Sequence, residues 1–159
     1  FDTAGRTMMG VTSRDMVKSV GKLDYKPLGF GANCGTGASD LLRTILGMTD
    51  AEPDLPLISK GNAGLPKYHD GHIHYDGTPK LMADYAELAR NCGAKIIGGC
   101  CGTTPDHLRA MREALETRPK GDRPTLDDIT AALGTFSSGS DGTDGNGPVR
   151  AARRGKRRI

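Results

Sequence analysis

Short apolar segments alternate with helical patterns along this chain, and glycine-rich turns separate the two. The apolar segments have the length of buried strands and cover residues 1–4, 28–33, 55–59 and 95–99. Apolar residues at helical spacing follow them, in residues 12–20, 39–46, 79–92 and 105–117. Strands that alternate with helices are typical of parallel βα units. The chain is therefore expected to be an α/β protein with four such units.

Several helix boundaries are marked by local sequence signals. Thr12 is expected to cap the first helix, with Asp15 in its first turn. The pairs Thr78-Pro79 and Thr104-Pro105 each provide a cap and a first helical residue. These signals place the helices independently of the strands.

Two architectures accommodate four parallel units in 159 residues. One is half of a (β/α)8 TIM barrel, which as a whole has about 250 residues, and the other is an open four-stranded sheet. Phe1 is not an initiator Met and lies inside an expected strand, so we expect further chain upstream. Barrels carry their functional groups at the C-terminal ends of the strands, and the cysteines discussed next lie there, which favours the barrel.

Three of the four cysteines end apolar segments. Cys34 follows residues 28–33, and the adjacent pair Cys100 and Cys101 follows residues 95–99. Neighbours on a strand point to opposite faces, but the surrounding glycines allow the chain to turn there. Three thiolates suit a soft metal ion, which we expect to be Zn²⁺, and a site with three protein ligands leaves one position open for chemistry. Cys92 fits a buried small residue instead.

The four histidines are expected to be ordinary surface residues. His69, His72 and His74 have metal-like spacing, but the glycine and aspartate around them favour a long polar surface loop. His107 falls in the first turn of a helix and is expected at the surface.

Beyond residue 117 the chain changes character. Residues 118–136 are expected to form a short helical extension, with Ile129 and Leu133 as its apolar anchors. Residues 137–159 read as a disordered Gly/Ser/Asp linker and a basic tail. The last ten residues hold six basic side chains and no aromatic residue, so nucleic-acid binding is not expected.

The composition also bears on location. No apolar run approaches the ~20 residues that span a membrane. The adjacent cysteines would form a strained ring if bridged, so reduced thiols and a cytoplasmic protein are expected.

Three motifs together resemble the homocysteine S-methyltransferase family, which includes betaine–homocysteine methyltransferases and the homocysteine-binding module of cobalamin-dependent methionine synthase. They are the segments 31–34 (GANC), 62–66 (NAGLP) and 98–105 (GGCCGTTP), in the family's order and spacing. The resemblance covers residues 1–117. It implies the C-terminal half of a (β/α)8 barrel, with its last four βα units, and it implies that Cys34, Cys100 and Cys101 are zinc ligands.

The resemblance also implies a reaction. A zinc-dependent enzyme of this kind transfers a methyl group to the homocysteine thiolate and forms methionine. The donor remains open among betaine, a methylated corrinoid and S-methylmethionine. Asn33 and Asn62 are expected to contact substrate, with no catalytic residue beyond the metal ligands. The expected partner is the missing N-terminal half-barrel or a second copy of the chain, and the alternative is a non-catalytic zinc-binding fragment.

Overall fold

The structure is a computed structural model, and it describes residue 1 and residues 5–139. It is a mixed α/β fold with five helices in the described part. The helices are α1 (Ser13–Gly21), α2 (Ala38–Thr49), α3 (Pro79–Asn91), α4 (Pro105–Thr117) and α5 (Leu126–Leu133). The strands are β1 (Phe30–Asn33), β2 (Leu57–Gly61), β3 (Pro66–His69), β4 (His72–Tyr75) and β5 (Ile96–Gly99). Residues 2–4 of the strand expected at 1–4, and residues 140–159 of the linker and tail expected at 137–159, lie outside this description.

The main sheet has three parallel strands in the order β1-β2-β5. The register pairs Asn33 with Lys60 and Lys60 with Gly98, so the C-terminal ends of all three strands lie at one edge. The parallel βα arrangement predicted from the sequence is confirmed for these strands. Closure of the sheet into a barrel is not part of the described structure.

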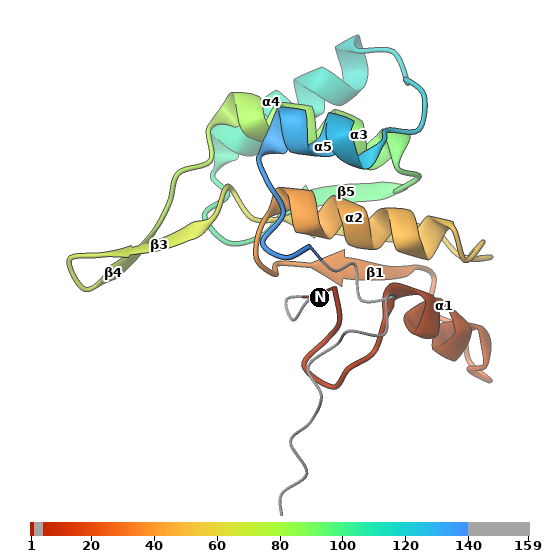
Figure 1. The fold of residues 1–159 in the computed structure, drawn as a ribbon. Helices are drawn as coiled ribbons and strands as arrows, with labels where there is room; N and C mark the ends of the chain where they lie inside the picture. Colours follow the sequence, from red (N-terminus) through yellow and green to blue (C-terminus); the bar gives the residue numbers. More distant parts are fainter. Residues whose placement is uncertain (2–4, 140–159) are drawn as a thin grey trace, which may run out of the picture.

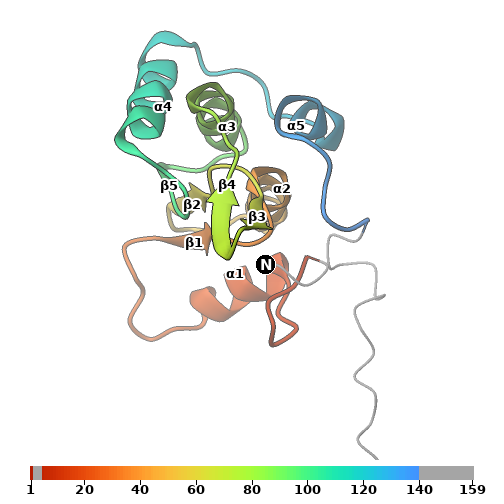
Figure 2. The same ribbon diagram turned by 90° about the vertical axis from the view of Figure 1, so that its left-hand side faces the viewer.

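Helices cover one face of this sheet. On β2, Leu57 and Ser59 are buried toward the helices, whereas Lys60 is exposed on the opposite face. Tyr85 of α3 is fully buried, and its hydroxyl lies 2.7 Å from that of Ser59. Figures 1 and 2 place α1 on the β1 side of the molecule and α4 on the β5 side. The second face of the sheet therefore has no helical layer within the described residues.

The helix starts follow the predicted caps. The Thr12 side chain accepts a hydrogen bond from the backbone of Asp15, and the Asp15 carboxylate accepts one in return. The Thr78 side chain accepts from the backbone N–H of Leu81 at the start of α3. These local bonds satisfy backbone donors that a helix leaves free at its first turn.

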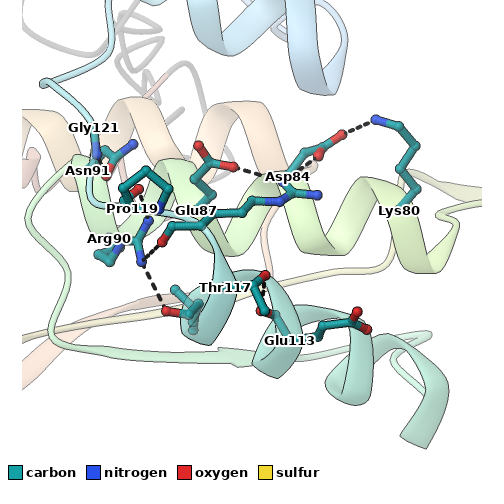
Figure 3. Close-up of polar contacts among 11 residues, drawn as sticks. Lys80, Asp84, Glu87, Arg90, Asn91, Glu113, Thr117, Pro119 and Gly121 are labelled. Atoms are coloured by element: carbon teal, nitrogen blue, oxygen red, sulfur yellow. Dashed lines mark hydrogen bonds and ion pairs between the residues drawn. The ribbon is translucent and has the colours of Figure 1, made fainter.

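Arg90 fastens α3 to the end of α4, as Figure 3 shows. Its guanidinium donates to the carbonyl oxygens of Leu115 (3.1 Å), Arg118 (3.0 Å) and Pro119 (2.7 Å). Arg118 in turn pairs with Asp84 and Glu87 of α3. The last carbonyls of a helix lack hydrogen-bond donors within that helix. At the end of α4, Arg90 of α3 provides these donors.

The polar segment that was expected to be a surface loop is a β-hairpin. β3 and β4 pair antiparallel and project from the body, with Tyr68 and Ile73 opposite each other and exposed (Figure 1). Asp70 and Gly71 form the turn with φ of 49° and 81°. An Asp-Gly pair with two positive φ angles is a favoured two-residue hairpin turn. The expected surface location is confirmed, whereas the expected irregular loop is wrong.

Residues beyond α4 return to α2. Ile129 of α5 is fully buried, as predicted for an apolar anchor. The Asp40 carboxylate accepts from the backbone N–H of Ser137 (3.0 Å), and Arg43 donates to the carbonyl of Ser138 (2.8 Å). The Arg43 guanidinium also lies 4.4 Å from the ring centroid of Phe136. This segment is therefore packed onto the N-terminal half of α2.

Candidate metal centre

Cys34 lies where β1 ends and the chain turns. Its backbone N–H donates to the carbonyl of Lys60 (3.0 Å), which continues the pairing of β1 with β2. Its φ is 61°, in the left-handed region, and Gly35 follows with a φ of 78°. A non-glycine residue rarely adopts this conformation, and such residues concentrate at functional sites. The turn directs the chain from the strand end into α2.

The adjacent cysteines reach one place because β5 ends just before them. The N–H of Cys100 makes the last bond to β2, at the carbonyl of Gly61 (2.7 Å). A turn follows, in which the N–H of Thr103 donates to the carbonyl of Cys100 (3.2 Å). Outside an extended strand, neighbouring side chains no longer point to opposite faces. The Sγ atoms of Cys100 and Cys101 accordingly lie 4.0 Å apart.

The three sulfur atoms form one cluster. The Sγ atoms of Cys34 and Cys101 are 3.6 Å apart, and all three lie within 4.8 Å of one another. Tetrahedral zinc with Zn–S bonds of about 2.3 Å holds its sulfurs about 3.8 Å apart. All three cysteines are free thiols of intermediate exposure. The donor set therefore fits a soft metal ion, and no other His, Cys, Asp or Glu in the described part of the chain joins it.

Hydrogen bonds shift the ionisation of the paired thiols. Burial raises the pKa of Cys100, but hydrogen bonds from Asn33 and from the other cysteines outweigh it, so that pKa lies below its usual value. The pKa of Cys101 is raised, chiefly by its hydrogen bond with Cys34, and Tyr75 opposes this shift. A bound cation would favour the thiolate form of each cysteine.

Asn62 joins the two cysteine loops. It is 1% exposed; its Nδ2 donates to the carbonyl of Gly35 (3.2 Å), and its Oδ1 accepts from the N–H of Cys101 (3.2 Å). Asn33 is exposed, and its Nδ2 lies 3.7 Å from the Sγ of Cys100. Both asparagines thus lie at the cluster, and substrate contact by either one stays a prediction.

Two residues at the site carry roles that the sequence analysis did not assign. The pKa of Tyr75 is raised by its side-chain hydrogen bond with Cys101 and by burial.

His107 is 8% exposed, so its expected surface location is wrong. Its Nδ1 accepts from the N–H of Thr104 (3.0 Å), and its Nε2 lies 2.8 Å from the carbonyl of Gly77. The capping-box position of His107 in α4 was the available signal.

The other cysteine and the hairpin histidines, which were predicted not to bind metal, are not part of the cluster. Cys92 is 1% exposed, and burial raises its pKa to about 12. His69, His72 and His74 are exposed on the hairpin and belong to no group of metal-ligating side chains in the described residues.

Within the described residues, every helix is too short or too polar to pass through a bilayer.

Comparison with known families places this cluster in context. Residues 1–115 match the model of the family described as homocysteine S-methyltransferase. The chain belongs to the homocysteine S-methyltransferase family. The matched region contains Cys34, Cys100 and Cys101, and it ends before α5. Members of this family are methyltransferases that act on homocysteine with a methyl donor.

Proposed function

We propose that this chain carries the zinc-binding part of a zinc-dependent homocysteine S-methyltransferase, which forms methionine from homocysteine. The observation that carries the proposal is the cluster of three sulfur atoms within 4.8 Å at the ends of β1 and β5. In the described residues no fourth ligating side chain completes it. A three-ligand zinc site leaves a position for substrate, whereas structural zinc sites are closed.

The chain's residues would supply the geometry of the reaction. Cys34, Cys100 and Cys101 would hold Zn²⁺, and Asn62 would fix the separation of the two loops that carry them. Zinc, when bound, favours the thiolate form of a substrate thiol at neutral pH. The homocysteine sulfur then forms a bond to the methyl carbon, the bond from that carbon to the donor breaks, and the thiol proton has gone to solvent.

A complete (β/α)8 barrel is part of this proposal. Among the described residues, no strand pairs with the outer edges of β1 and β5, and Lys60 is exposed on the face of the sheet that no described helix covers. In a barrel that face is the packed interior and no edge remains. We infer that residues 1–117 are the C-terminal half of the barrel and that a complementary N-terminal half, or a second copy of this chain, completes it. Residues 118–136 and 137–159 would be an extension and a tail, and the free thiols agree with a cytoplasmic location.

Cobalt substitution tests the proposal. The purified chain is loaded with Co²⁺, whose thiolate charge-transfer absorption reports its ligands, and is titrated with homocysteine. Homocysteine should change this absorption, and methionine at the same concentration should not, because a thioether is a poorer ligand. An unchanged spectrum with homocysteine would favour the non-catalytic zinc-binding fragment. The methyl donor is identified separately, by methionine formation from betaine, a methylated corrinoid or S-methylmethionine once the chain is completed by an N-terminal half-barrel.

A further inference from the structure

The chain that follows α5 returns to the start of α2. We call residues 134–138 the strap. They lie beyond residue 115, where the family match ends, and Figure 1 shows them passing the N-terminal end of α2. The Ser39 hydroxyl donates to the carbonyl of Gly134 (2.7 Å), which fixes the first residue of the strap on the first turn of α2. The strap is therefore attached to the matched region although it lies outside it.

Arg43 holds the other end of the strap. Its guanidinium donates to the carbonyl of Ser138 (2.8 Å) and lies 4.4 Å from the ring centroid of Phe136. The same guanidinium pairs with the Asp40 carboxylate (2.8 Å), and both side chains are 7% exposed. A buried pair of charges needs further hydrogen bonds to satisfy its remaining groups. The strap and the loop before α2 supply such bonds here.

The Asp40 carboxylate joins the strap to the loop that carries Cys34. One of its oxygens, Oδ2, accepts from the backbone N–H of Ser137 (3.0 Å) and from the hydroxyl of Thr36 (3.0 Å). The hydroxyl oxygens of Thr36 and Ser137 lie 3.1 Å apart. Thr36 follows Cys34 by two residues, so a short path of hydrogen bonds leads from the strap to a metal ligand.

The Cys34 loop is thus held from two sides. Asn62, in the loop after β2, donates to the carbonyl of Gly35 (3.2 Å). Asp40 and the strap hold the next residue, Thr36. Cys34 has a left-handed φ of 61°, and such a conformation persists only where the surrounding structure enforces it. The position of the Cys34 sulfur therefore depends on both sets of contacts.

We propose that the strap positions a metal ligand: through Asp40 and Thr36 it holds the Cys34 loop in the conformation that brings the Cys34 sulfur to the other two cysteines. The inference rests on the metal site of the proposed function, and it adds to that site a segment outside the family match. Thr36 and Asp40 are positioning residues, since the ligating group among the described residues consists of the three cysteines. Loss of the strap contacts leaves all three sulfurs present but lowers their affinity for metal.

The first test compares Thr36→Val with Thr44→Val in the full chain. Each change replaces a hydroxyl group by a methyl group. The Thr36 hydroxyl links Asp40 to the Cys34 loop, whereas the Thr44 hydroxyl donates to the carbonyl of Asp40 within α2 (3.0 Å). Zinc affinity is measured by competition with a chromophoric chelator, and the Co²⁺ charge-transfer band is recorded. We expect Thr36→Val to lower zinc affinity about 5-fold or more, as the loss of one hydrogen bond implies, and to shift the band, and Thr44→Val to change neither.

The second test separates the strap from general stability. Phe136→Ala removes the ring that contacts Arg43 and so loosens the strap. Ile129→Val removes one methyl group from a fully buried residue of α5, which destabilises the same extension at a position outside the strap. We expect Phe136→Ala to lower zinc affinity and to shift the band as Thr36→Val does, and Ile129→Val to keep both at their wild-type values.

The double variant Thr36→Val/Phe136→Ala tests whether the two changes act on one path. It should bind zinc about as tightly as the weaker-binding single variant, because changes in one network are not additive. Fully additive losses would contradict the common path.

Wild-type zinc affinity and an unshifted band in Thr36→Val or in Phe136→Ala would overturn the inference, as would an equal loss of affinity in Ile129→Val and Phe136→Ala. Failure of the wild-type chain to bind zinc or cobalt would instead overturn the proposed function, so the two failures are distinguishable.

Discussion

Cys34 and Cys101 are 67 residues apart in the sequence, and their sulfur atoms are 3.6 Å apart in the structure. Parallel pairing of β1 and β5 with β2 brings the two strand ends to one edge of the sheet. The separation is too long for a disulfide, which needs about 2.05 Å, and it is the separation of two sulfurs on one metal ion. The proposed metal centre can therefore be tested by replacing single cysteines.

Cys101→Ser should abolish stoichiometric zinc binding. We expect one zinc per wild-type chain and a large loss in the variant, because two thiolates remain of a three-ligand set. Zinc is measured by metal analysis after gel filtration. Cys92→Ala is the matched control, since Cys92 is buried outside the cluster, and it should retain full zinc. Full zinc in Cys101→Ser would contradict the assignment of the ligands.

Asn62→Ala should weaken both the fold and the metal centre. The change removes two hydrogen bonds that join the loops of Cys34 and Cys101 and leaves the partly buried carbonyl of Gly35 and N–H of Cys101 without these partners. We expect the free energy of unfolding to fall by about 1–3 kcal/mol and zinc affinity to fall with it. Asn91→Ala provides the control, because its one bond to Gly121 is exposed. Equal effects in urea unfolding of the two variants would argue against this role.

Asp84 should contribute to stability above its unfolded pKa and lose that contribution in acid. Burial raises the pKa of Asp84, but the hydrogen bonds from Lys80 and Arg118 outweigh it, so the folded pKa is lowered. The contribution is therefore fully present above about pH 4, near the unfolded pKa, and is lost as pH falls through the folded pKa.

The variant that tests this dependence is Asp84→Asn. It should lose about 1 kcal/mol at neutral pH and show a flatter fall in stability below pH 4, measured by urea unfolding at several pH values. Asp106→Asn changes a carboxylate that is 71% exposed beside Arg109, so solvent screening should make its effect smaller. If the stability of Asp84→Asn fell more steeply below pH 4 than that of the wild type, the lowered pKa of Asp84 would be contradicted.

Two truncations should separate the packed extension from the tail. Removal of residues 140–159 should leave zinc binding and the melting temperature unchanged. Removal of residues 134–159 also deletes Phe136, which stacks on Arg43, and the backbone groups that bond to Ser39, Asp40 and Arg43. This second deletion should cost about 1–3 kcal/mol. Differential scanning calorimetry gives the melting temperature of each truncated chain. Equal melting temperatures would contradict the stabilising role of residues 134–139.

The chain alone should show no methyl transfer, because the sheet of residues 5–139 has two unpaired edge strands, which leaves its inner face open. Co-expression with a matching N-terminal half-barrel should raise the yield of soluble protein and produce methionine from homocysteine. Turnover by a purified monomer of this chain would refute the half-barrel inference. A yield that does not respond to the partner half would also count against it.

Some of this structure was accessible from the sequence because its causes are local. A threonine before a first turn satisfies free backbone donors within four residues, so Thr12 and Thr78 marked helix starts correctly. The strand-end position of the cysteines needed only the parallel βα pattern. The Asp70-Gly71 turn was equally local, and the hairpin was missed because its polar strands lack an apolar face.

The tertiary structure decided what depends on distant partners. The sequence put Cys34 and Cys100 at strand ends, but only the order β1-β2-β5 placed their loops together. His107 is buried because the carbonyl of Gly77, 30 residues earlier, completes its hydrogen bonds. The Tyr75 ring packs against the turn that follows the cysteine pair because Gly102 has no side chain to keep the ring away. The sequence alone determined which groups were available at the strand ends, and long-range packing determined which of them touch, since a contact between distant residues is fixed by the geometry of every element between them.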